Sequence, residues 1–314
     1  MKKLFGLFAA LLEIIALILI FDYVRINIRY YVDKNNYNEE FDIQGINNKY
    51  TPQGLAYSEK YNVALQTSYN KKGLVSMLYI TDVDNNELIK SLKILNSDGS
   101  NNTKHVGGIT TDDNRIWITS DYTVDIIDLN EVMTTDEDFI KIRESYKLIN
   151  RGDFTLYDNG ILWIGDFFLK YIYDCPDDNP LLFGYILDSD FSYDNPDYVI
   201  SLPMMIQGME RDKTGKFIFT DSYTNLINSK LTIYSNVLEE NASTYTINGR
   251  DIPYYKFDES NLIKTYKIPP MAEGFYLKNN DLYILFESGS DTYWEAFPKL
   301  YKVLKFSPKE IGKN

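Results

Sequence analysis

A two-part phrase that recurs five times constrains the fold of this chain more than any other feature of its sequence. Each copy opens with a glycine and leads, 13 or 14 residues later, to the small polar end of an apolar run. The copies run from Gly54 to Ser68, from Gly108 to Asp121, from Gly152 to Asp166, from Gly208 to Ser222 and from Gly274 to Ser288. Such a repeat predicts an architecture that uses one structural unit several times.

Each repeat unit has room for four short strands. In the first unit they fall at residues 54–57, 63–68, 77–82 and 88–95, and polar turns separate them. The later units follow the same plan, although the fourth carries a long insertion near residues 239–258. Four antiparallel strands followed by a return to the same phrase are typical of a propeller blade, so the sequence predicts an all-β propeller.

The last unit stops one strand short, and the missing strand can be found at the other end of the chain. Residues 40–43 hold the position before Gly54 that each fourth strand holds before the next repeat glycine. We therefore expect this N-terminal strand to complete the last blade and close the ring, which removes two exposed sheet edges. The count is then five blades, or six if the insertion folds as a degenerate blade; two separate β domains are the alternative.

The openings of the repeat resemble those of the β-propeller superfamily, with an architecture like that of the TolB, NHL and phytase-esterase propellers. The residues concerned are Gln53-Gly54, Gln207-Gly208 and Glu273-Gly274, and the resemblance covers about residues 40–306. Glu273-Gly274-Phe275, followed by the run that ends in Glu287, looks like the Glu-Gly openings of phytase-like esterase and calcium-activated nucleotidase propellers. That second likeness implies a calcium-dependent hydrolase.

An apolar run at residues 4–21, interrupted only by Glu13 and preceded by Lys2 and Lys3, is long enough to cross a bilayer. No small-residue cleavage motif follows Phe21, so we predict an uncleaved signal anchor. The expected organisation is an anchor at residues 1–24, a juxtamembrane linker at 25–38 and the propeller at 39–314. Basic residues flank the run on both sides, and we favour the orientation that places the propeller outside the cytoplasm.

Composition excludes several classes of partner and site. The net charge of −13 repels phosphate, which argues against a nucleic-acid partner. The single cysteine, Cys175, excludes an internal disulfide and a cysteine-cluster metal site. An acidic surface is compatible with binding cations, including Ca²⁺.

Both halves of the repeated phrase should meet on one face of the ring. Because the first two strands of a blade are antiparallel, the start of the first lies beside the end of the second. Loops from several rigid blades then surround a concave mouth, where propellers can bind ligands. The residues that we expect on this ligand-binding face are Gln53, Tyr69, His105, Tyr122, Arg151, Asp153, Gln207 and Tyr223.

Candidates for chemistry lie on the same face. His105 is the only histidine and is a candidate base, together with Glu273 and Asp153. Five carboxylates could form an oxygen cage for Ca²⁺, or supply a glycosidase pair. These five are Asp121, Asp166, Asp221, Glu273 and Glu287. The alternative is that such polar residues only satisfy loop backbone groups.

Two function classes follow from the sequence. The first is a membrane-anchored propeller that binds a small-molecule or protein ligand without chemistry, since no Gly-x-Ser-x-Gly elbow, phosphate loop or zinc signature is present. The second is a calcium-dependent hydrolase of esterase, lactonase or nucleotidase type. The aromatic pairs Tyr254-Tyr255 and Tyr293-Trp294 could floor a sugar or peptide site, or could pack within the blades.

Overall fold

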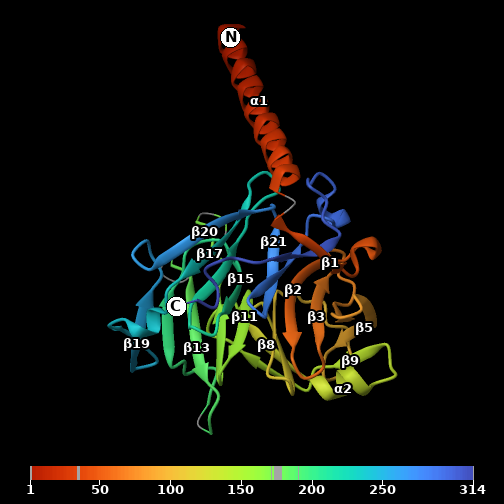
Figure 1. Ribbon diagram of the computed structural model, residues 1–314, viewed down its shortest axis with the longest axis vertical. Helices are drawn as coiled ribbons and strands as arrows, with labels where there is room; N and C mark the ends of the chain where they lie inside the picture. The colour runs from red at the N-terminus through yellow and green to blue at the C-terminus, as the bar shows by residue number, and fades with distance from the viewer. Residues whose placement is uncertain (1, 34–35, 171, 173–178, 190, 314) are drawn as a thin grey trace.

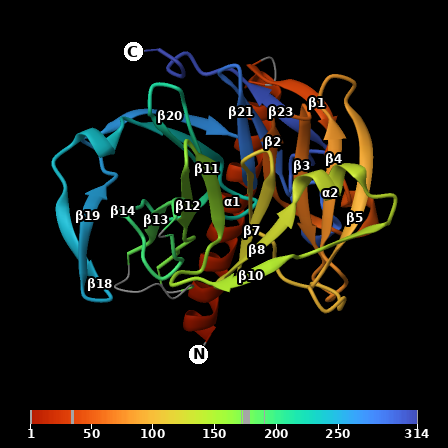
Figure 2. The same ribbon diagram turned by 90° about the horizontal axis from the view of Figure 1, so that it is seen from below.

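The computed structural model describes residues 2–33, 36–170, 172, 179–189 and 191–313. Cys175 lies outside these residues. Five mainly antiparallel sheets are arranged around a common centre (Figures 1 and 2), which confirms the predicted five-bladed all-β propeller.

The first three blades follow the repeat units along the chain. Blade 1 contains β2 (Thr51–Ser58), β3 (Val63–Tyr69), β4 (Met77–Asp82) and β5 (Glu87–Leu95). Blade 2 contains β6 (Gly108–Thr111), β7 (Arg115–Ser120), β8 (Thr123–Asp128) and β10 (Glu144–Lys147). Blade 3 contains β11 (Phe154–Asp158), β12 (Ile161–Gly165), β13 (Leu181–Ile186) and β14 (Tyr198–Ser201).

The last two blades complete the ring. Blade 4 contains β15 (Ile206–Arg211), β16 (Phe217–Asp221), β17 (Ser229–Tyr234) and β20 (Leu262–Ile268). Blade 5 contains β21 (Ala272–Lys278), β22 (Asp281–Phe286), β23 (Lys302–Phe306) and, as its outermost strand, β1 (Asn38–Asp42). The predicted closure by an N-terminal strand is confirmed, because β1 pairs antiparallel with β23 through Asn38–Lys305 and Glu39–Leu304.

The insertion in the fourth unit does not form a sixth blade. It folds into a hairpin of β18 (Ser243–Ile247) and β19 (Arg250–Lys256), and β19 pairs in parallel with β14. The hairpin therefore widens blade 3, because the outer edge of that blade offers unpaired backbone groups. In the same way β9 (Phe139–Lys141), which follows the short helix α2 (Leu129–Thr134), pairs in parallel with β5 of blade 1.

Aromatic pairs fill the contacts between blades. Trp163 of blade 3 meets Phe217 of blade 4 edge to face, with ring centroids 5.8 Å apart. Trp117 of blade 2 stacks on Tyr157 of blade 3 at 5.5 Å. Because neighbouring blades cover both faces of the inner strands, strands such as β2 and β3 are buried on both sides, whereas outer strands such as β10 are exposed. Aromatic side chains supply much of the surface that is buried between the blades.

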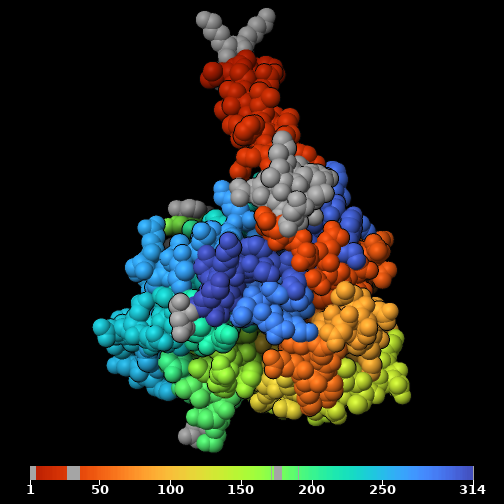
Figure 3. Space-filling model, in the orientation of Figure 1, coloured from red at the N-terminus to blue at the C-terminus, as the bar shows by residue number. Residues whose placement is uncertain are grey.

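The helix α1 (Lys2–Asp33) stands clear of the propeller beside blade 5 (Figures 1 and 3). Its residues Phe5–Ile26 are long and apolar enough to cross a membrane. The helix continues past residue 25, where we expected a linker, since no proline or glycine interrupts the sequence before Asp33. Tyr23 contacts the ring of Phe297 in the loop after β22, with centroids 5.5 Å apart, and Ile26 is buried.

Candidate functional site

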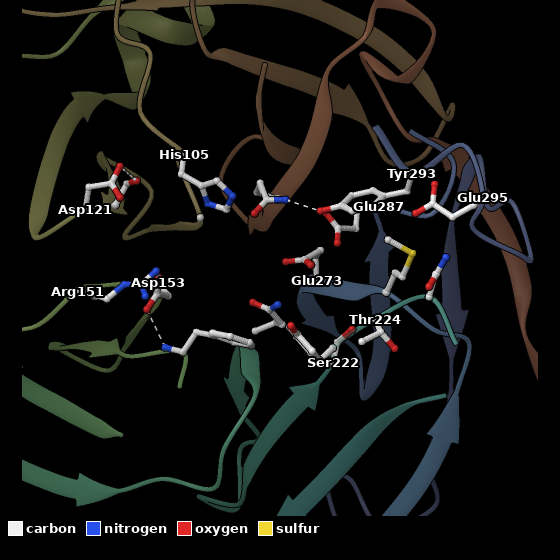
Figure 4. A pocket seen from close by; sticks show the side chains of 18 residues that line it. His105, Asp121, Arg151, Asp153, Ser222, Thr224, Glu273, Glu287, Tyr293 and Glu295 are labelled. Carbon is white, nitrogen blue, oxygen red and sulfur yellow. Dashed lines mark hydrogen bonds and ion pairs between the residues drawn. The ribbon is translucent and has the colours of Figure 1, made fainter. Parts of the chain in front are cut away.

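A cavity of about 490 Å³ opens at one end of the ring, where the innermost strands begin and the second strands end. We call this end the cavity face and the other end the turn face. All five blades contribute to the lining (Figure 4). The lining includes six of the eight residues predicted for the ligand-binding face, namely Gln53, His105, Arg151, Asp153, Gln207 and Tyr223.

The repeat glycines let the innermost strands of neighbouring blades approach closely at the cavity. A Cβ atom on Gly274 of blade 5 would lie 2.6 Å from the backbone nitrogen of Leu55 in blade 1. A threonine of the second strand then ties one blade to the next, as Thr220 Oγ1 donates to the Glu273 carbonyl at 3.0 Å. Thr67 does the same between blades 1 and 2, donating to the Val106 carbonyl at 2.8 Å. The repeated phrase therefore allows the innermost strands of neighbouring blades to pack closely around the axis of the ring.

Irregular pairing at the glycine phrase brings polar side chains to the cavity. In blades 1, 4 and 5 the register between the first two strands shifts across Gln53, Gln207 and Glu273. A bulge of this kind changes the direction in which a side chain points and is common beside functional sites. The Gln-Gly and Glu-Gly openings of the sequence therefore mark three of the residues that line the cavity.

Two buried carboxyl groups form the centre of one cavity wall. The side chains of Glu273 and Glu287 are only 5% and 9% exposed and share a hydrogen bond. Gln53 Nε2 donates to Glu287 Oε2 at 3.3 Å, and the Tyr293 hydroxyl also hydrogen-bonds Glu287. Burial raises the pKa of both glutamates, and the charge of Glu287 raises the pKa of Glu273 further. The pair therefore holds a proton at neutral pH.

His105 lies on the adjacent wall, where its ring centroid is 4.2 Å from that of Tyr69. The imidazole is exposed to the cavity, but protein atoms surround the cavity on most sides. Desolvation lowers the pKa of His105, Asp121 opposes this change, and Arg151 and Lys71 add to it. The ring is consequently neutral at pH 7 and can both donate and accept a hydrogen bond.

An ion pair from blade 3 faces the glutamates across the cavity. Arg151 Nη2 donates to Asp153 Oδ1 at 2.9 Å, and the Phe167 backbone nitrogen donates to Asp153 Oδ2 at 2.8 Å. Behind them Asp166 is buried and accepts a hydrogen bond from the Gly152 nitrogen at 3.2 Å. Burial raises the pKa of Asp153 to about 6 and that of Asp166 to about 7.

The five carboxylates considered for Ca²⁺ do not form a cage. Among the described residues, no group of three or more His, Cys, Asp or Glu side chains could hold a metal ion. Asp166 is occupied by the backbone of Gly152, and Asp221 Oδ2 accepts from Lys230 Nζ at 3.3 Å. Asp121 lies on another wall, so Glu273 and Glu287 are left as a pair. A cage requires ligands that converge on one point, which these strand ends do not provide.

Two residues predicted for the ligand-binding face do not line the cavity. Tyr69 lies behind His105, and Tyr122 is half exposed on the neighbouring loop. Several lining residues from irregular loops carry no signal in the repeat, and these are Phe167, Thr224, Asn225, Met271 and Glu295. Ser120 and Ser222 also line the cavity and belong to the repeated phrase. Of the two aromatic pairs, Tyr293 lines the cavity, whereas Tyr254 and Tyr255 belong to β19 at the outer edge of blade 3.

The cavity rim contains backbone in the left-handed region. Asp121, Thr224 and Met271 have φ angles of 50°, 74° and 65°. Residues other than glycine adopt this conformation at a cost of roughly 1–3 kcal/mol, and such strain is concentrated at functional sites. The rim geometry therefore supports a role for the cavity face that goes beyond closing the ring.

No family model matches the chain, and no curated protein matches its sequence. Among solved structures, a glutaminyl cyclase from Myxococcus xanthus matches with a TM-score of 0.48 and 8% identity over 86% of this chain and 94% of that one. A PQQ-bound aldose sugar dehydrogenase from Streptomyces coelicolor matches with a TM-score of 0.47 and 10% identity, covering 85% and 96%. A luciferin-regenerating enzyme has a TM-score of 0.45 and 12% identity, covering 87% and 94%. Nothing about the chemistry of this chain follows from likenesses at that level.

Proposed function

We propose that this protein is a membrane-anchored propeller that binds a small polar ligand, cationic or polyhydroxylated, in its axial cavity. The observation that carries the proposal is the buried pair of Glu273 and Glu287 on the wall of an open cavity. Burying two carboxyl groups costs stability unless partners satisfy them. A ligand that hydrogen-bonds or neutralises the pair would offset that cost.

The charge of the cavity supports this class of ligand. Of the described side chains that line it, Arg151 is the only cation, and Asp153 pairs with it. Asp121, Glu295 and the glutamate pair leave an excess of negative charge. Aromatic rings of Phe167, Tyr223 and Tyr293 add surfaces on which an organic cation or a sugar ring can pack.

The apolar helix supports anchoring of the propeller to a membrane. Phe5–Ile26 is exposed along most of its length, with Ile26 buried at its end, and has the composition of a membrane span. We place the propeller outside the cytoplasm, an orientation that protease protection in intact cells tests. Digestion of the propeller only after the cells are opened would contradict it.

Ligand binding can be tested by thermal shift and calorimetry on the full chain in detergent. The probes are tetramethylammonium and spermidine as cations, glucose and sorbitol as polyols, and acetate as an anion. We expect at least one cation or polyol to stabilise the protein, and Glu287→Gln to weaken its binding about tenfold or more. Glu137→Gln, an exposed residue between α2 and β9, is the matched control and should bind normally. Binding of acetate alone, or equal affinity in the two variants, would contradict the proposal.

An acid–base hydrolase is the second candidate function. It is favoured by the shared proton of Glu273 and Glu287, because such a pair provides a proton donor and an acceptor in one site. Ester, lactone and nucleotide substrates should be assayed with the wild type and with Glu273→Gln, in the presence of either EDTA or Ca²⁺. Turnover that Glu273→Gln abolishes would establish the enzyme, and the response to EDTA would show whether it needs a cation.

A further inference from the structure

The loops of the cavity face present large apolar side chains to solvent. Each of the five loops that lead from the second to the third strand of a blade contributes at least one of them, namely Leu74, Tyr122, Ile172, Ile227 and Trp294. The loop after β22 also contributes Tyr301, and the loop before β15 contributes Met204. Trp294 is 81% exposed. Exposed apolar residues that occur singly are ordinary, but one on every blade at the same end of a ring forms a surface.

The turns of the opposite face are polar. Among the described residues of these turns no large apolar side chain is exposed, but Leu88, Ile89, Ile186, Leu262 and Ile263 are exposed at the strand ends next to them. The turns are built from residues such as those of Asp112-Asp113-Asn114 and Asn279-Asn280. The exposed apolar residues of the cavity face therefore belong to its loops, whereas those near the turn face belong to the ends of strands.

The apolar helix ends on the same face. Tyr23 contacts Phe297, which belongs to the loop that also carries Trp294, and Ile26 is buried. The 22 residues of Phe5–Ile26 span about 33 Å, close to the hydrocarbon thickness of a bilayer. Because Tyr23, near the end of this segment, contacts Phe297 and Ile26 is buried, the segment leads directly to the cavity face. Tyr23 is also the kind of residue that is enriched at a membrane interface.

Charge on this face is mixed, and its basic part lies on blade 1. Lys71 and Lys72 precede Leu74 in the loop after β3 and are exposed, whereas Asp121, Asp291 and Glu295 are exposed acidic residues of the other loops. Basic residues beside apolar ones are typical of surfaces that rest in the headgroup region, even though the whole chain carries a net charge of −13.

We propose that the cavity face docks on the bilayer that holds α1, with Leu74, Tyr122, Ile172, Ile227 and Trp294 in the interfacial region. The cavity mouth then opens toward the lipid headgroups and not toward bulk solvent. This inference rests on the membrane anchoring given under the proposed function.

Tryptophan fluorescence tests the docking, because Trp294 is the exposed member of the three tryptophans. Trp117 and Trp163 are 1% and 0% exposed and give a constant background. The full chain is reconstituted in vesicles of phosphatidylcholine and phosphatidylglycerol, with and without brominated acyl chains. We expect brominated lipid to quench the wild type by at least a quarter of the Trp294 signal, as a rough estimate for a ring at the interface. Trp294→Phe should lose this quenching.

Two further variants test the face rather than a single loop. Trp294→Phe/Ile227→Trp moves the probe to blade 4 on the same face, and it should be quenched by brominated lipid and protected from acrylamide. Trp294→Phe/Ile186→Trp moves it to the end of β13 next to the turn face, and it should show the opposite behaviour. Quenching by acrylamide but not by brominated lipid at both 294 and 227 would overturn the docking.

Alkaline carbonate extraction separates the two proposals. A protein that carbonate releases from the vesicles lacks the anchor, which would overturn the anchoring and the docking together. A protein that stays in the membrane while both cavity-face probes remain accessible to acrylamide would overturn the docking alone and leave the anchored propeller intact.

Discussion

The cavity face and the turn face are built from the ends of the same strands, yet their buried carboxyl groups have different surroundings. At the turn face the buried Asp212 carboxylate accepts hydrogen bonds from the backbone nitrogens of Thr214, Lys216 and Gly312, and these bonds lower its pKa despite burial. At the cavity face Glu273 and Glu287 are buried beside each other, and burial raises the pKa of both. The difference teaches that the strands alone do not determine these features, because strands impose the same requirements at both ends.

A steric comparison of two glycines should give the largest effect. The Cβ of Gly274→Ala would meet three backbone atoms of blade 1 within 3.1 Å, whereas a Cβ at Gly160 on the turn face meets nothing within 4 Å. We expect Gly274→Ala to cost about 2–3 kcal/mol of unfolding free energy by overpacking. Gly160 itself has a φ of 85°, which an alanine side chain disfavours. We therefore expect Gly160→Ala to lower the unfolding free energy by about 1 kcal/mol. Chemical denaturation in detergent measures the unfolding free energy of both variants. Equal losses would show that the innermost strands can move apart to accommodate the extra methyl group.

The glutamate pair should make stability depend on pH. A carboxyl group whose pKa is raised on folding binds more protons in the native state than in the unfolded state, so unfolding free energy falls as pH rises. From pH 5 upward we expect the wild type to lose up to about 1.4 kcal/mol per pH unit more than Glu273→Gln/Glu287→Gln. His105 has a lowered pKa and acts in the opposite direction, but it is present in both proteins and cancels. Parallel pH profiles of the thermal midpoint would contradict the shared proton.

The smallest predicted difference in stability is between variants of two Arg–Asp ion pairs at opposite ends of the ring. Arg151→Ala leaves Asp153 partly buried with one backbone donor, and we expect a cost of about 1–2 kcal/mol. Arg115 is half exposed beside Asp112, so Arg115→Ala should cost less than about 1 kcal/mol. Unfolding midpoints of the two variants, compared at low and high salt, check the difference. Equal unfolding midpoints for the two variants would mean that solvent screens the ion pair in the cavity as strongly as the exposed pair.

The architecture could be predicted from the sequence because one signal was repeated five times. Strand positions, the closure by residues 40–43 and the three openings with Gln53, Gln207 and Glu273 all follow from the phrase and from the geometry of antiparallel strands. The hairpin of β18 and β19 was not predictable in the same way. Its placement on blade 3 depends on a free strand edge in the folded ring, which no local pattern encodes.

The chemistry of the cavity could be predicted only in part. The repeat indicated that Glu273 and Glu287 lie at neighbouring strand ends, and they do share a hydrogen bond. It could not indicate that Asp166 accepts a hydrogen bond from Gly152, or that Asp221 accepts one from Lys230. The partner of a polar side chain at a strand end depends on the tertiary structure around it. Met271 and Asn225 come from loops that lie outside the repeat.

The strand that closes the ring also has a consequence for how the chain folds during synthesis. Asn38 pairs with Lys305, which lies 267 positions later in the chain (305 − 38). Contacts of such long sequence separation form slowly, and until then β1 is an unpaired edge directly after a segment suited to a bilayer. The ribosome would have to deliver four and a half blades before that edge finds its partner, so the nascent chain has a long interval in which a chaperone or a neighbouring copy could bind β1 instead.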